Sequence, residues 1–265
     1  MRLRRAQIDA PAPPEWEYVP EGWSRTVRGW DVPSVEAAYR RRWPEFVAAV
    51  RGNGTLGVAH EVAEGRPVVV DDPGWHDIAM TFGYVLARAA CGDERLSLLD
   101  WGGGPGHYYV LARALLPEVE LDYHSRDLPL LAALGREVLP EAHFHDDDTC
   151  LERSYDLVLA SDSLQYSQDL PAMLARLGAA ARPWLFVAQL PVAREADSFV
   201  VLQRPYGYGY ETEYLGWVVN RDELRQAAGD AGLVLEREFL APGRIDAAGA
   251  PERPVAQRSF LFRKR

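Results

Sequence analysis

The residues best suited to chemistry form a glycine-rich segment, LLDWGGGPGHYY, from Leu98 to Tyr109. The apolar run Leu96–Trp101 predicts a strand that ends at these glycines, and helical spacing resumes at His107. Open α/β sheets bind ligands at such turns, where a parallel strand ends beside a helix N-terminus. Asp100, at the strand end, is expected to fix the turn or to reach a ligand amine. Glycines let a ligand approach the backbone, so we predict a ligand site at Gly102, Gly103, Gly104 and Gly106.

Acidic residues follow the next two predicted strands. Asp127, in SRDLP, ends the second strand about 20 residues after the glycines, where an acid that holds ribose hydroxyls is expected. Asp122 lies within that strand and is the weaker candidate. Asp146, Asp147 and Asp148 follow the third strand, where an acid could accept a hydrogen bond from an adenine amino group. The glycine turn and the acids in this order predict a nucleoside-containing ligand.

The elements that position these residues alternate between strands and helices from Leu96 onward, which favours a doubly wound α/β sheet. Two final strands, Leu233–Leu240 and Arg258–Arg265, have no helix between them and predict an antiparallel pair. We expect a Rossmann-like, mostly parallel sheet of seven strands whose last strand is antiparallel. Residues 1–92 are expected to form an N-terminal helical cap, with a kink or two short helices at Pro44. Residues 93–265 are expected to form the ligand-binding domain, with an insertion at 191–221.

Composition limits the classes of partner. The 265 residues carry a formal net charge of -10, which argues against a broad surface for nucleic acid or an anionic membrane. No run approaches the ~18 apolar residues of a membrane span, and no apolar run follows the N-terminal charges as in a signal peptide, so a cytoplasmic protein is expected. Two cysteines, Cys91 and Cys150, give neither a disulfide framework nor a metal-ligand spacing, and we expect no metal.

The motifs DWGGGPG, RDLP and HDDD together resemble class I S-adenosylmethionine-dependent methyltransferases. SDSLQY at 161–166 and the segment from Gln189 to Leu224 resemble a narrower bacterial methyltransferase family of surface-glycan and specialised-metabolite gene sets. The resemblance covers roughly residues 75–240 and implies the fold and the cofactor. This chain departs from the common pattern at Trp101 and Pro105, where small or branched residues are usual, and at His124 inside the second strand.

The resemblance also implies roles for individual residues. The four glycines would pass the methionine part of S-adenosylmethionine, and Asp127 would hold the ribose, with Leu128 against the adenine. Asp147 or a neighbour such as Asp146 would meet the adenine amino group. Ser161 and Asp162, at the end of the fourth strand, would lie nearest the reactive methyl group.

Methyl transfer needs a general base only when the acceptor ionises poorly, as a hydroxyl does. His107, at the helix start, and Asp162 are the candidate bases, each with a structural alternative: a local hydrogen bond for His107 and a helix cap for Asp162. The strand histidines His124, His143 and His145 are better explained as core or edge residues. His60 and His76 belong to the predicted cap and could reach over the site.

The aromatic segment Arg204–Trp217 is too long for a simple connection, and long loops are often functional. It is interpreted either as a lid that binds the acceptor or as a loop that packs on the cap or on a dimer partner. The N-terminal tryptophans Trp16, Trp23, Trp30 and Trp43 could line a pocket, although packing is the simpler explanation. The predicted acceptor-binding residues are Tyr206, Tyr208, Tyr210 and Trp217.

The leading hypothesis is methyl transfer to a small-molecule acceptor, most simply to oxygen of a sugar or a specialised-metabolite intermediate, by a protein that could form a homodimer. A nicotinamide-dependent oxidoreductase is the first alternative, but the loop reads GGGPG and the chain ends in an antiparallel pair. A non-catalytic binding module is the second alternative. A nucleic-acid methyltransferase is disfavoured by the charge and by SDSLQY in place of an N/D-P-P-Y-type tetrapeptide.

Overall fold

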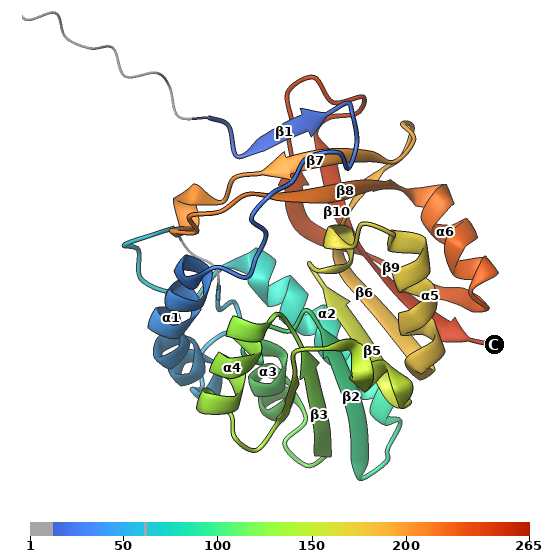
Figure 1. Cartoon of the computed structure of the whole chain (residues 1–265). Helices are drawn as coiled ribbons and strands as arrows, with labels where there is room; N and C mark the ends of the chain where they lie inside the picture. Colours follow the sequence, from blue (N-terminus) through green and yellow to red (C-terminus); the bar gives the residue numbers. More distant parts are fainter. Residues whose placement is uncertain (1–12, 61–62) are drawn as a thin grey trace, which may run out of the picture.

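The computed structural model describes residues 13–60 and 63–265. Within these residues a ten-stranded sheet runs in the order β1-β7-β8-β6-β5-β2-β3-β4, and β10 joins β6 to β9 (Figure 1). The strands are β1 Trp16–Val19, β2 Arg95–Trp101, β3 Glu120–Arg126, β4 His143–His145, β5 Tyr155–Ser161, β6 Ala181–Ala193, β7 Phe199–Gln203, β8 Tyr214–Asn220, β9 Leu233–Ile245 and β10 Val255–Lys264. The helices are α1 Pro33–Arg51, α2 Pro73–Ala90, α3 His107–Leu115, α4 Pro129–Val138, α5 Leu170–Ala180 and α6 Arg221–Asp230, with short 3-10 turns η1 Asp148–Glu152, η2 Leu164–Tyr166 and η3 Tyr206–Tyr208.

Seven strands make the predicted Rossmann-like sheet, in the order β4-β3-β2-β5-β6-β10-β9. Strands β2 to β6 pair in parallel, whereas β10 runs antiparallel to both β6 and β9. The expected antiparallel last strand is therefore confirmed. α3 joins β2 to β3, α4 joins β3 to β4, and α5 joins β5 to β6, so the carboxyl ends of these parallel strands meet at one edge of the sheet.

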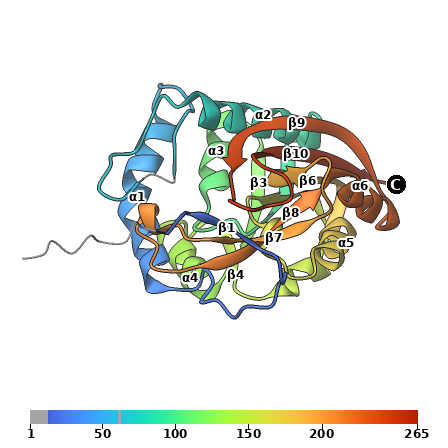
Figure 2. The same ribbon diagram turned by 90° about the horizontal axis from the view of Figure 1, so that it is seen from above.

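The strand count corrects the prediction of seven. β1, β7 and β8 form an additional antiparallel group, called the wing below, which joins the main sheet where β8 pairs with the end of β6. The predicted insertion 191–221 supplies β7 and β8, and the predicted helical cap supplies β1. The wing lies across the carboxyl ends of the central strands, between α1 and the pair α5 and α6 (Figures 1 and 2). A run of five buried residues, FVVLQ, makes β7 a strand and not part of a free loop.

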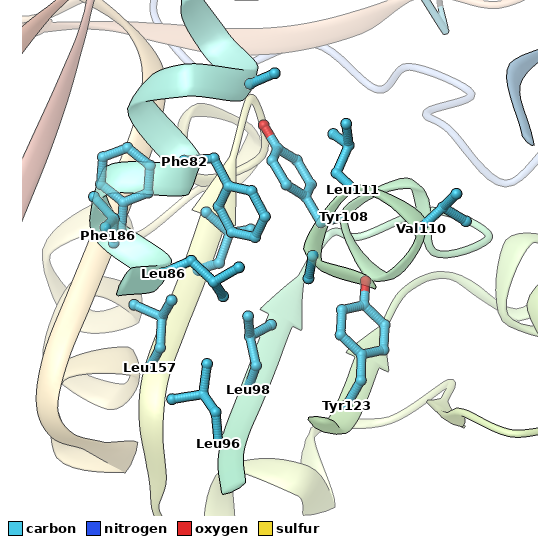
Figure 3. Close-up of a cluster of buried hydrophobic side chains, with 14 of the residues drawn as sticks. Phe82, Leu86, Leu96, Leu98, Tyr108, Val110, Leu111, Tyr123, Leu157 and Phe186 are labelled. Carbon is cyan, nitrogen blue, oxygen red and sulfur yellow. The ribbon is translucent and has the colours of Figure 1, made fainter. Parts of the chain in front are cut away.

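Helices cover both faces of the sheet. One core cluster joins α1, α2 and α3 to one face of β2, β3 and β5, and another joins α5 and α6 to the opposite face. Figure 3 shows the first cluster, in which Phe82 and Leu86 of α2 lie over Leu98 and Leu157 of the sheet. Strand residues alternate between the two clusters, as the period of two in a strand requires. This packing holds the edge with the strand ends in a rigid frame.

Two expectations about the N-terminal region can be compared with the structure. α1 continues through Pro44 as one helix of 19 residues, so the proline does not divide it. Residues of α1 and α2 share one hydrophobic core with β2 and β5, so the boundary proposed at residue 92 does not separate two cores. In the described part of the chain, no helix combines the length and apolar character needed to cross a membrane.

Candidate active site

The glycine turn after β2 packs tightly against the protein on one side and is open on the other. A Cβ at Gly103 would lie 2.5 Å from the Asp100 carboxylate, and one at Gly102 would collide with Ser163. Gly104 has φ +56°, and its nearest obstacle would be His107 Nδ1 at 3.7 Å. Gly102 and Gly103 are therefore required by the packing of the turn itself, whereas Gly104 presents its backbone to the adjacent cavity.

Asp127 connects this turn to the end of β3. Its Oδ2 accepts a hydrogen bond from Gly104 N at 2.7 Å, and its Oδ1 accepts one from Leu128 N at 2.7 Å. The side chain is buried, and burial raises the pKa of its carboxyl group against the lowering effect of these two bonds. Each carboxylate oxygen has a second lone pair, so Asp127 can accept further hydrogen bonds from a ligand that carries adjacent hydroxyl groups.

Asp100 does not face the cavity. It is fully buried beneath the turn, where Tyr123 Oη donates to its Oδ2 at 2.5 Å. Burial raises the pKa of Asp100 to about 7. The structure thus supports the first of its two predicted roles, fixing the turn, and leaves Asp100 out of the lining of the cavity.

The end of β5 and the neighbouring part of β6 present a polar network beside the turn. Ser161 Oγ lies 2.7 Å from Tyr108 Oη and accepts a hydrogen bond from Gln189 Nε2 at 3.0 Å. Asp162 and Gln189 both adopt left-handed backbone conformations, with φ of +47° and +56°. Gln165 donates from Nε2 to Asp162 Oδ1. Such conformations are costly for residues other than glycine and cluster at functional sites, here where β5 ends beside Gln189 of β6.

His107 begins α3 and is buried among aromatic rings. Its ring centroid lies 4.4 Å from that of His60 and 4.7 Å from that of Phe46. Burial, with the nearby His60, holds the pKa of His107 well below its usual range, and burial lowers the pKa of His60 to about 3. Both imidazoles are therefore neutral near pH 7, and each has one ring nitrogen whose lone pair can accept a hydrogen bond.

A single cavity of about 860 Å³ unites these groups. One end is formed by Gly102, Gly103, Gly104, Asp127 and Leu128, and Ser161, Asp162 and His107 also line it. The other part lies under the wing and is lined by aromatic and amide side chains: Trp16, Trp23, Trp30, Tyr166, Tyr208, Tyr210, Tyr214, Gln165, Gln189, Gln203 and Gln257. Its volume suits a small-molecule site, since such sites occupy about 300–1,000 Å³.

Several predicted site residues are not brought to this cavity. Asp146 pairs with Arg136 at 3.0 Å, and Asp147 accepts from Thr149 N at 3.0 Å where η1 begins. Because η1 follows β4 directly, its cap uses the acid that was expected to meet an adenine. Gly106 has φ +101° and packs against Leu139, and it is also absent from the cavity lining.

Of the predicted acceptor-binding residues in the aromatic segment Arg204–Trp217, some line the cavity and others do not. Tyr208 and Tyr210 line the cavity, and Tyr210 is almost fully buried. Tyr206 is 45% exposed and donates to Glu213, whereas Trp217 packs on Trp23 and donates to the Gln168 carbonyl oxygen. The wing thus orders this segment, which is not a free lid.

Sequence reasoning missed the residues that form the far wall. Trp16, Trp23 and Trp30 line the cavity, although packing was the simpler explanation, and Trp30 stacks on Tyr214 at 4.2 Å between ring centroids. Trp43, in contrast, belongs to the hydrophobic core. Gln165 lies in SDSLQY, and Gln189 and Gln203 lie in the segment from Gln189 to Leu224, so these segments of the resemblance were the available signal, although no role was predicted for the three residues.

The residues present fit S-adenosylmethionine at the glycine end of the cavity. A Cβ-free backbone at Gly104 leaves room beside the turn, and the buried Asp127 carboxylate offers free lone pairs at the position where ribose hydroxyls are expected. Leu128 adds an apolar surface next to this acid. The aromatic and amide part of the cavity remains for a second molecule.

A mostly parallel sheet with an antiparallel last strand, together with this glycine turn and acid, defines a class I S-adenosylmethionine-dependent methyltransferase. A family described as "Methyltransferase domain" matches residues 76–238, and the chain belongs to this family. The predicted class and the cofactor of that class are thereby confirmed, and the oxidoreductase alternative is rejected. No curated protein matches the sequence significantly.

Solved structures with a similar fold include three methyltransferases. A protein of Galdieria sulphuraria provisionally named a sarcosine dimethylglycine methyltransferase is 13% identical with TM-score 0.52, covering 86% of this chain and 98% of its own. The 1,6-didemethyltoxoflavin-N1-methyltransferase of Burkholderia thailandensis is 18% identical with TM-score 0.49, covering 94% and 99%. The amino pentose methyltransferase CalS10 of Micromonospora echinaspora is 18% identical with TM-score 0.46, covering 72% and 92%.

Proposed function

We propose that the protein transfers the methyl group of S-adenosylmethionine to a hydroxyl oxygen of a small molecule, a sugar or a specialised-metabolite intermediate. The observation that carries this proposal is the single cavity, which runs from the glycine turn to a chamber of aromatic and amide side chains. Flat aromatic faces with amide and hydroxyl groups suit a ring that bears several hydroxyl groups. The wing roofs this chamber, which favours a small acceptor over a polymer.

S-adenosylmethionine supplies a methyl group on a sulfonium that is already an activated leaving group. The chain's own residues then need to align the acceptor, to exclude water and to remove one proton. Asp162 is the proposed base, because it lines the cavity at the end of β5 and Gln165 holds its Oδ1. His107 is the alternative base. Because its ring packs among the aromatic rings of α1, we propose that it instead forms part of the cavity wall beside the cofactor.

The first experiment is a titration of the purified protein with S-adenosylhomocysteine and, separately, with NAD. At about a hundredfold excess over Kd, the true ligand should stabilise the protein by about 2.7 kcal/mol and raise the melting temperature. A shift with S-adenosylhomocysteine only is expected. A shift with NAD only, or with neither molecule, would contradict the proposal.

A second experiment addresses the acceptor and the base. Hydroxylated ring compounds and their amino analogues are incubated with S-adenosylmethionine, and methylated products are detected by mass spectrometry; methylated hydroxyls are expected. Asp162→Asn should then lower kcat by about 10²- to 10⁴-fold with unchanged S-adenosylhomocysteine affinity. If only amino analogues react, the oxygen assignment is wrong. If His107→Gln alone lowers kcat, the base is His107.

Location and assembly are also proposals. We propose a cytoplasmic protein that needs neither nucleic acid nor a membrane as a partner and that assembles as a homodimer. The net charge of -10 supports the absence of a nucleic-acid or anionic-membrane partner.

A further inference from the structure

A second group of chemically capable side chains lies on β3 and β4, outside the cavity lining. Asp122 and His124 are two residues apart on β3 and so share a face of the sheet. His143 of β4 is the register partner of His124. The opposite face carries Tyr123, which belongs to the core under α3. Three potential ligands thus meet at the edge of the sheet, although no sequence spacing indicates them.

The distances between the ligand atoms of Asp122, His124 and His143 suit the coordination of a metal ion. Asp122 Oδ1 lies 3.1 Å from His124 Nε2 and 3.9 Å from His143 Nε2, and the three ligand atoms all lie within 4.8 Å of one another. Ligands about 2.1 Å from a tetrahedral ion lie about 3.4 Å from each other. The pairing of β3 with β4 fixes the backbone positions of His124 and His143 relative to each other. Only small side-chain rotations are therefore needed to bring the three ligand atoms to coordinating distances.

His124 Nε2 lies within hydrogen-bond distance of two groups, 2.8 Å from Arg153 NH1 and 3.1 Å from Asp122 Oδ1. On the other side of the ring, His124 Nδ1 lies 2.9 Å from His145 Nε2. An ion on Nε2 would leave the ring proton on Nδ1, where His145 Nε2 can accept it. The guanidinium of Arg153 contacts both His124 and Asp122.

We propose that Asp122, His124 and His143 bind a divalent transition-metal ion of the zinc class. Two imidazoles and one carboxylate are ligands that zinc prefers, and water would complete the coordination. His145 would orient the His124 ring by accepting its Nδ1 hydrogen, as partners of ligating histidines do. Arg153 contributes a competing positive charge that moves aside on binding. The ion would tie the short edge strand β4 to β3, independently of the methyltransferase function.

The test is calorimetric titration of chelator-treated protein with Zn²⁺, with Mg²⁺ as a second probe. One Zn²⁺ site and no Mg²⁺ binding are expected, since Mg²⁺ prefers oxygen ligands. His143→Ala should abolish the site, and His145→Ala should weaken it by about 10- to 100-fold. Arg153→Ala should bind more tightly because the competing charge is gone. His76→Ala, on α2 and outside the group, is the matched control and should bind as the unaltered protein does.

Thermal unfolding gives a second readout that does not depend on activity. Zn²⁺ should raise the melting temperature of the unaltered protein and of His76→Ala but not that of His143→Ala, whose own melting temperature without metal shows whether it folds. Equal Zn²⁺ affinity in His143→Ala and the unaltered protein would mean adventitious surface binding and would overturn the proposal. Unchanged or weaker binding by Arg153→Ala would contradict the competing role of the guanidinium.

Discussion

At the scale of single residues, the Asp127 carboxylate both holds the glycine turn and lines the cavity. It accepts hydrogen bonds from the Gly104 and Leu128 backbone N–H groups, and it faces the cavity. A carboxylate accepts both bonds, whereas an amide nitrogen must donate and would oppose one of these N–H groups. The residue therefore holds the turn in shape while it offers lone pairs to a ligand.

Asp127→Asn is accordingly expected to lower the free energy of unfolding by about 1–3 kcal/mol, the cost of one buried N–H group left unpaired. It should also abolish the melting-temperature shift caused by S-adenosylhomocysteine. Asp146→Asn is the control: its carboxylate pairs with Arg136 at the surface, so stability should change by less than about 0.5 kcal/mol and the shift should persist. A lost shift in Asp146→Asn would restore its predicted adenine role.

Asp100 gives a prediction about pH. Burial raises its pKa in the folded protein to about 7, above the ordinary value near 4 for an unfolded chain. The folded state thus binds the proton more tightly, and this stabilisation is present at low pH and is lost as pH rises from about 4 to 7. Asp100→Asn removes this titration.

Chemical denaturation between pH 4 and 8 tests the effect. The unaltered protein should lose up to about 1.4 kcal/mol per pH unit relative to Asp100→Asn over this range. A difference between the two proteins that stays constant with pH would show that Asp100 has the same pKa in the folded and unfolded states.

At the scale of elements, two glycines in helices distinguish the effect of side-chain packing on stability from the effect of helix propensity. Gly135 of α4 lies against Phe144 of β4, and a Cβ there would collide with the aromatic ring. Gly229 of α6 has no heavy atom within 4 Å of the same position. Both are in helices, so both lose the same backbone entropy on folding.

Gly229→Ala should therefore stabilise the protein by up to about 1 kcal/mol, the difference in helix propensity. Gly135→Ala should destabilise it, because displacement of Phe144 costs about 1–3 kcal/mol, more than the propensity gained. Urea denaturation of both variants beside the unaltered protein measures the contrast. Equal stabilisation of both would mean that α4 does not pack closely on β4.

At the scale of the whole molecule, the wing connects the N-terminal segment to the edge of the sheet that carries the site. Trp30 precedes α1 and stacks on Tyr214 of β8, while β1 pairs with β7. We propose that the part of the cavity built by the ends of β2 and β3 holds the cofactor and that the part built largely by the wing holds the acceptor.

Trp30→Ala should weaken acceptor binding and leave cofactor binding unchanged. It removes an aromatic face from the acceptor chamber, so KM for the acceptor should rise by about tenfold or more, the effect of about 1.4 kcal/mol of lost binding. S-adenosylhomocysteine affinity should stay unchanged in calorimetry, because the rings that Trp30 contacts belong to Tyr166, Tyr210 and Tyr214, outside the glycine turn. Loss of cofactor affinity would show that the wing supports both parts of the cavity.

The central sheet and its glycine turn follow from signals that are local in the sequence. Buried parallel strands such as YDLVLAS are nearly uniformly apolar, and the glycines and Asp127 act through local backbone geometry at strand ends. Because these signals lie within a few residues of each other, the succession of strands and helices and the class of cofactor could be predicted from the sequence.

Which side chains share the cavity depends instead on contacts between distant parts of the chain. Trp16 and Gln203 lie far apart in the sequence and meet because β1 pairs with β7, while Asp146 and Asp147 are turned away by the start of η1. The same is true of Asp122 and His143, brought together by the register of β3 and β4. Pairing between distant strands has no local signature, because it depends on the packing free energy of the whole sheet and not on the spacing of neighbouring residues.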